Sequence, residues 1–285
     1  MKKKTFGYKL INIIVLLAAA CIFLLNYSAH DLFRHVSTMQ ICGIVTTVIA
    51  VHLLKGLRLY FALYGADISL PQYMRTYCKV TPVSILFPFK LGELFRMYCY
   101  GVETGNMLKG VVTVILDRFM DTIALVTMII LIWFTDNGAM IPLVYILVVF
   151  LVCAVVVFLV FPGLYRYWKK YFLRADATPR KLGMLRLLDN MNRVYEEIAS
   201  VSRGRGLILY VLSLLAWAVE MGSVAMAGKA MGERDIAGRL AAYLSSALSS
   251  SQAPELKQFV FISVIMMLAI YVVVKIFEGG RPERN

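Results

Sequence analysis

The sequence predicts an all-α protein, a polytopic membrane helix bundle of about six full spans plus two re-entrant or broken helices. Hydrophobic residues make up 60% of the 285 residues and charged residues only 16%, whereas about a quarter of a soluble domain is charged. Apolar runs of roughly 20 residues, long enough to cross a bilayer, recur along the chain. The length predicts one transmembrane domain over residues 1–285.

Six apolar runs have the length of a full span. They are Lys9–Tyr27, Met39–Tyr60, Gly110–Phe134, Ile141–Phe161, Leu207–Ala230 and Phe259–Phe277. The first run follows three lysines, so a cleaved signal peptide is an alternative for it. Its length and the lack of a clean cleavage site favour a retained span.

The distribution of Lys and Arg predicts the orientation of these spans. With the N-terminus inside, most of the 30 basic residues fall in cytoplasmic segments, which is the bias that orients membrane helices. Both termini are therefore expected in the cytoplasm. Because these short loops account for the net charge of +13, no nucleic-acid partner is expected.

Two further apolar segments are too short to span. Met74–Pro88 lies among inner charges, and its prolines are expected to break it, while Ile236–Pro254 lies on the outer side and is rich in Ala and Ser. We interpret both as re-entrant, since irregular backbone is tolerated in a membrane where protein or a water-filled cavity shields it. A surface amphipathic helix is the alternative for each.

The order of these segments predicts an inverted repeat. Residues 9–134 read as two spans, a short segment and a third span, and residues 141–277 repeat that order from the other side, a frequent plan in transporters. Between them, the basic cytoplasmic loop of residues 162–206 is expected to contain an amphipathic helix that starts at Thr178-Pro179. That helix would lie on an anionic leaflet or pack on the bundle.

The five cysteines and three histidines show no spacing typical of a ligand set or a redox pair. No metal, no cofactor and no disulfide is therefore expected.

Charged residues inside apolar segments are costly in a bilayer, so they mark candidate sites. The third span contains Asp117, Arg118 and Asp121, and Arg118 and Asp121 are spaced to pair along one helix. They form either a structural cluster that holds helices together or part of a headgroup or ion path. Glu220, inside the fifth span, would face a cavity or the Arg118 region.

A second charged group precedes the third span. Lys90, Glu93 and Arg96 follow Pro88 at the start of a short helix, where free N–H groups suit phosphate. The alternative is an ordinary inner loop with a surface ion pair between Glu93 and Arg96. Arg58, at the inner end of the second span, can extend to the membrane surface.

Together these runs resemble a known family. Pro88-x-x-x-Gly92-Glu93-x-x-Arg96, followed by Asp117-Arg118-x-x-Asp121, is similar to the lysylphosphatidylglycerol synthetase transmembrane-region family, also called flippase-like. Arg58 and Glu220 look similar too, and the resemblance covers nearly the whole chain. Two departures are Asp117, where Glu is usual, and residues 249–255, which lack the family's Gly-rich run and leave Glu255 as a possible stand-in.

The resemblance implies handling of membrane lipids with anionic or phosphate headgroups. Some relatives fuse this domain to an aminoacyl transferase or a glycosyltransferase, and this chain has no length left for either, so the synthetic activity is not implied. The sequence shows no nucleophile–base pair or metal cluster, so no enzyme activity is expected. The expected function is a flippase-like transporter that moves a phospholipid or polyprenyl-linked lipid between leaflets of a bacterial or archaeal plasma membrane. The alternatives are an enzyme that modifies a membrane lipid and a non-catalytic partner of a cell-envelope glycosyltransferase.

The charged clusters and the resemblance together give the expected site residues. The expected headgroup and cavity residues are Arg58, Lys90, Gly92, Glu93, Arg96, Asp117, Arg118, Asp121 and Glu220. Lys90, Arg96 and Arg118 would hold phosphate, and the acidic residues would shape the cavity or couple transport to protons.

Overall fold

The computed structural model describes residues 2–34, 36–66, 68–87, 91–136, 142–174, 179–230, 232, 235–248 and 254–279. Within these ranges the regular secondary structure is entirely helical, which confirms the predicted all-α class. The helices are α1 (Lys2–Asn26), α2 (Ala29–Phe33), α3 (Thr38–Ala62), α4 (Leu70–Leu86), α5 (Leu91–Glu103), α6 (Met107–Asp136), α7 (Pro142–Arg174), α8 (Pro179–Ala230), α9 (Ile236–Leu248) and α10 (Pro254–Gly279).

Four of the described helices are long and apolar enough to cross a membrane. They are Thr38–Ala62, Val144–Arg174, Lys181–Lys229 and Leu256–Phe277, and Leu10–Asn26 is a shorter apolar helix. The 30 residues of α6 would extend about 45 Å, but charged residues interrupt their apolar character. The number of six spans therefore stays a prediction.

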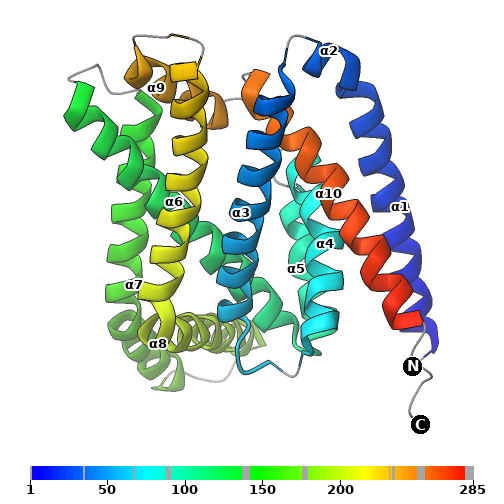
Figure 1. Ribbon diagram of the computed structural model, residues 1–285. Coiled ribbons are helices and arrows are strands. Elements are labelled where there is room, and N and C mark those ends of the chain that lie inside the picture. Colours follow the sequence, from blue (N-terminus) through cyan, green and yellow to red (C-terminus); the bar gives the residue numbers. More distant parts are fainter. Residues whose placement is uncertain are drawn as a thin grey trace.

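The helices form one bundle in which α8 packs between α3 and α6. Figure 1 shows α1 and α10 side by side along one edge of the bundle and α7 at the opposite edge. The start of α1 and the end of α10 lie at the same end of the bundle (Figure 1), the arrangement expected if both termini face one side of the membrane.

The first segment interpreted as re-entrant, Met74–Pro88, falls largely within α4, which packs against the next helix, α5, towards the end of the bundle where α1 starts (Figure 1). We refer to the two helices as the α4–α5 hairpin. Most of α4 from Tyr73 onward is buried, so the alternative of a surface helix is wrong there. The expected break at Pro82 is also wrong, because Pro82 lies inside α4. Pro82 lacks one backbone donor, but α4 continues past it to Leu86. The helix ends there because Pro88, which follows in the sequence, disfavours a helical conformation of the residue before it.

The second short segment forms α9, which lies towards the opposite end of the bundle (Figure 1). Tyr243 and Leu244 are buried in a cluster with residues of α6 and α8, so α9 packs on the bundle. Residues 249–253, which replace the family's Gly-rich run, lie outside the described residues, and the side chain of Glu255 is not described either.

The predicted cytoplasmic loop of residues 162–206 is mostly helical. Helix α7 passes Pro162 and ends at Arg174, and α8 continues without interruption from the amphipathic stretch into the predicted fifth span. Figure 1 shows the first part of α8 lying across the end of the bundle and the second part rising through it. The hydroxyl of Tyr165 donates to Asp189 over 2.9 Å, so the first part of α8 packs on the end of α7.

Candidate functional site

A network of ion pairs joins α3, α5 and α6 inside the bundle, and Arg58 of α3 is at its centre. Its Nε donates to Asp117 Oδ1 over 2.7 Å, and its Nη1 donates to Asp121 Oδ1 over 2.6 Å. The same Nη1 reaches Ser213 Oγ of α8 over 2.7 Å. Only 1% of the Arg58 side chain is exposed, so Arg58 holds three helices together and does not extend to the membrane surface.

Arg118 of α6 is held far more loosely. Its Nε lies 3.2 Å from Glu93 Oε1, while its other nitrogens lie 3.8 Å from carboxylate oxygens of Asp117 and Asp121. Its side chain is 41% exposed. The pair between Arg118 and Asp121 predicted from their spacing therefore forms, but the closer partner of Asp121 is Arg58.

Helix α5 adds Glu93 and Arg96 to the network. Arg96 Nη2 lies 3.2 Å from Asp117 Oδ2, and its Nη1 lies 3.5 Å from Glu93 Oε2. The hydroxyl of Ser84, on α4, donates to the carboxylate of Glu93. Both charged residues are buried, so the alternative of a surface ion pair is wrong. Lys90 lies outside the described residues.

Gly92 allows α5 to approach α4 closely. A Cβ at Gly92 would lie 2.5 Å from both the Cα of Ser84 and the carbonyl oxygen of Val83, closer than atoms pack without a backbone shift. The absence of a side chain thus brings Glu93, the next residue, within reach of Ser84. The sequence motif contained this glycine, but only the structure gives it a packing role.

Replacing Gly92 with alanine is expected to lower the free energy of unfolding by about 1–3 kcal/mol, because the added methyl group collides with backbone atoms of α4. Unfolding of the purified protein in mixed micelles, titrated with dodecyl sulfate, measures the change. Gly163→Ala in α7 is the matched control, since its Cβ would enter open space. It should stabilise slightly or have no effect, since alanine favours a helix over glycine. Equal effects of the two substitutions would contradict the packing role.

Glu220 of α8 faces a cavity, one of the two placements expected. Its Oε2 lies 3.6 Å from Nζ of Lys55 on α3, and its Oε1 accepts a hydrogen bond from the Tyr243 hydroxyl of α9 over 2.7 Å. Lys55 is partly exposed. Its pairing with Glu220 spans 165 positions of sequence, and no local spacing could have predicted it.

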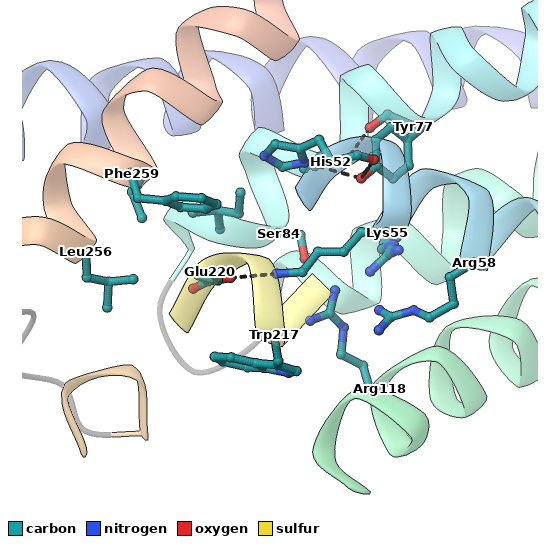
Figure 2. A pocket seen from close by; sticks show the side chains of 14 residues that line it. His52, Lys55, Arg58, Tyr77, Ser84, Arg118, Trp217, Glu220, Leu256 and Phe259 are labelled. Carbon is teal, nitrogen blue, oxygen red and sulfur yellow. Dashed lines mark hydrogen bonds and ion pairs between the residues drawn. The ribbon is translucent and has the colours of Figure 1, made fainter. Parts of the chain in front are cut away.

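The cavity has a volume of about 200 Å³ and lies beside the ion network. Figure 2 shows Arg58 and Arg118 towards one side, Leu256 and Phe259 towards the other, and Lys55 and Glu220 between them. Its lining comprises His52, Lys55, Arg58, Tyr77, Thr81, Ser84, Ile85, Arg96, Arg118, Trp217, Glu220, Leu256, Phe259 and Val260. The cavity thus has a cationic side and an aromatic, apolar side.

Among the described residues, the charges around the cavity balance. The basic residues are Lys55, Arg58, Arg96 and Arg118, and the acidic residues are Glu93, Asp117, Asp121 and Glu220. Such compensation is what a charged group needs inside a membrane. Arg118 and Lys55 are the more exposed cations of this group, so they are the ones that an anion in the cavity can reach.

Most of the sequence matches a family of known proteins. The family described as "Lysylphosphatidylglycerol synthase TM region" matches residues 10–254. This range runs from α1 to the start of α10 and includes every residue of the ion network. No curated protein and no solved structure matches the chain.

Proposed function

The chain belongs to the lysylphosphatidylglycerol synthase transmembrane-region family, and from this premise we propose that it is a flippase-like lipid transporter. It moves a phospholipid or a polyprenyl-linked lipid between the leaflets of a bacterial or archaeal plasma membrane. The family and the long apolar helices make it a membrane-integral protein related to lipid handling. The proposal adds transport and a headgroup that contains phosphate.

The observation that carries the proposal is the position of Arg118 in the cavity. Its side chain is 41% exposed, and its guanidinium nitrogens lie 3.2 to 3.8 Å from three carboxylates. If the guanidinium group turned towards a phosphate, Asp117 and Asp121 would keep their ion pairs with Arg58. Glu93 would keep its ion pair with Arg96. Arg118 can therefore exchange protein carboxylates for a lipid phosphate without leaving a buried charge unpaired, which would cost several kcal/mol.

The arrangement of the short helices supports the inverted repeat that we propose for transport. The α4–α5 hairpin and α9 lie towards opposite ends of the bundle (Figure 1), and both contribute to the polar centre, through Ser84 and through Tyr243. A site between two such elements can open to each side in turn. In this proposal both termini and the first part of α8 face the cytoplasm, in keeping with their basic residues.

Replacing Arg118 with glutamine is expected to reduce lipid transfer between leaflets by at least about tenfold, because the exchangeable cation is lost. Liposomes containing the purified protein and fluorescent phospholipid, or labelled polyprenyl phosphate, would report transfer as the loss of signal to an impermeant quencher. Arg203→Gln in α8 is the control, since Arg203 is exposed and does not line the cavity.

The same liposomes separate transport from the alternative functions. Chromatography of the lipids after the reaction should show the labelled lipid unchanged, because we propose transfer without chemical conversion. Absence of transfer for every lipid tested, with the protein folded, would overturn the proposal. If the folded protein transfers no lipid but co-purifies with an envelope glycosyltransferase, the role of a non-catalytic partner is supported.

A further inference from the structure

The last turns of α7 have two faces with different surroundings. One face packs on α8, where the ring centroids of Phe161 and Tyr195 lie 5.2 Å apart and the Tyr165 hydroxyl donates to Asp189. The opposite face forms an open groove with a volume of about 360 Å³, lined by Tyr167, Lys170, Tyr171 and Arg174. Steps of three and four residues keep these four side chains on one side of the helix, and all four are exposed.

The two cations of this groove have no ion-pair partner among the described residues. Lys169, one position from Lys170, pairs with Asp189 at 3.3 Å, but Lys170 and Arg174 point to the other side of α7. The surrounding sequence does not compensate them either, because residues 162–206 contain ten Lys or Arg and four Asp or Glu. The groove therefore favours an anionic occupant.

A stripe of valines continues the line of the groove into the apolar part of α7. The stripe is 52% to 61% exposed and consists of Val149, Val152, Val156 and Val160. The same helical spacing keeps it in line with Tyr167 and Arg174. From Val149 to Val160 the helix rises about 17 Å, close to the thickness of about 15 Å that one leaflet contributes to the hydrocarbon core. The apolar stripe thus has the length of the acyl chains of one leaflet.

The direction of the side chains brings the cations close to the membrane surface. In a helix the Cα–Cβ bonds tilt towards the N-terminus, so Lys170 and Arg174 lean back towards the valine stripe. Tyrosines beside basic residues at the end of an apolar run are typical of the headgroup layer. A cationic, aromatic groove below an apolar stripe as long as one leaflet fits a whole phospholipid, whereas an acidic segment of a partner protein would use the groove alone.

We propose that this face of α7 binds one anionic phospholipid, at a place that shares no residue with the lining of the cavity. The phosphate lies at Lys170 and Arg174, the rings of Tyr167 and Tyr171 flank it, and the acyl chains lie along the valine stripe. Helix α7 ends where α1 starts (Figure 1), so in the proposed orientation the lipid belongs to the cytoplasmic leaflet, whose surface is negative. Only 6% of the most apolar stretch of this helix is buried in the protein, and the lipid supplies contacts that the bundle does not.

The fluorescence of Trp168 tests the proposal, because its ring centroid lies 5.8 Å from that of Tyr167 and 5.7 Å from that of Tyr171. Trp133→Phe and Trp217→Phe leave it as the only tryptophan of the three. The full-length protein is placed in phosphatidylcholine vesicles that contain a small fraction of either phosphatidylglycerol or phosphatidylcholine brominated near the top of one acyl chain. Brominated phosphatidylglycerol should quench with an apparent affinity about tenfold higher, since each cation near the surface attracts anionic lipid.

A double variant in the same background removes the charge of the groove. Lys170→Gln with Arg174→Gln should reduce the preference for phosphatidylglycerol about fivefold or more, and concentrated salt should weaken the preference of the parent protein by screening. Arg166→Gln with Arg203→Gln is the matched control, because it removes the same charge from exposed residues that do not line the groove. The control should keep the preference.

Three results would overturn the proposal. They are equal quenching by the two brominated lipids, a preference that survives in the groove variant, and a preference that the control loses to the same extent. Polyglutamate added to the vesicles gives the outcome for a protein partner: a change of Trp168 emission on its addition, without a preference for phosphatidylglycerol, would assign the groove to an acidic protein segment instead. The proposed transport stands in each case, because Arg118→Gln tests it through the cavity.

Discussion

Replacing Arg58 with leucine is expected to lower the free energy of unfolding by about 3–5 kcal/mol, the range found when one partner of a buried ion pair is removed. The guanidinium group bonds Asp117 and Asp121 at 2.7 and 2.6 Å and is 1% exposed. Leucine would leave Asp121 with Arg118, at 3.8 Å, as its remaining ion-pair partner among the described residues. Unfolding in mixed micelles titrated with dodecyl sulfate and followed by circular dichroism measures the loss.

Arg203→Leu is the control for this substitution, because Arg203 is exposed on α8. Surface substitutions usually change stability by less than about 0.5 kcal/mol. Arg58→Lys should fall between the two, since one ammonium group cannot reproduce the fork that bonds two carboxylates and Ser213. An Arg58→Leu variant as stable as the control would show that the network does not hold the three helices together.

The role of Arg58 was beyond prediction from the sequence. Sequence spacing identifies partners only within one helix, such as Arg118 and Asp121, which are three residues apart. Arg58 and Asp117 lie 59 positions apart and meet only because α3 and α6 pack together. The sequence could therefore identify the charged residues of the site, but it could not tell which arginine is buried and which is open to the cavity.

Most of the helices could be predicted, because a span needs a long apolar run and such runs are visible in sequence. The ends of the helices could not be predicted in this way. The apolar character of the sequence ends at the membrane surface, but the hydrogen bonding of a helix can continue beyond it. Helix α7 therefore extends past the predicted end at Phe161 to Arg174. For the same reason α8 joins the amphipathic helix and the fifth span in one element.

His52, Trp217 and Lys55 line the cavity but are not among the site residues expected from the sequence. A single His or Trp in an apolar run usually packs in the core, and nothing in the sequence separates that case from a cavity residue. What distinguishes His52 and Trp217 is a ring nitrogen that has no hydrogen-bond partner among the described residues and lies beside an open volume. That property depends on the packing of α3 against α8 and α10, which only the fold supplies.

Asp117→Asn should be the most damaging isosteric change in the network. Asp117 is fully buried, its Oδ1 accepts from Arg58 over 2.7 Å, and its Oδ2 faces Arg96 at 3.2 Å and Arg118 at 3.8 Å. An asparagine keeps the shape but removes the charge, and it must turn an NH₂ group towards one of these donors. We expect a loss of about 3–5 kcal/mol in the free energy of unfolding, measured in the same dodecyl sulfate titration.

The order of three Asp→Asn variants tests whether burial and partner number set this loss. Asp121 has two arginine partners and is slightly exposed, so Asp121→Asn should cost less than Asp117→Asn. Asp189, in the exposed pair with Lys169, should show little effect, because exposed ion pairs contribute little. If Asp189→Asn is as harmful as Asp117→Asn, the losses reflect removal of any carboxylate. If the order holds, burial and the number of arginine partners determine how much each carboxylate contributes to stability.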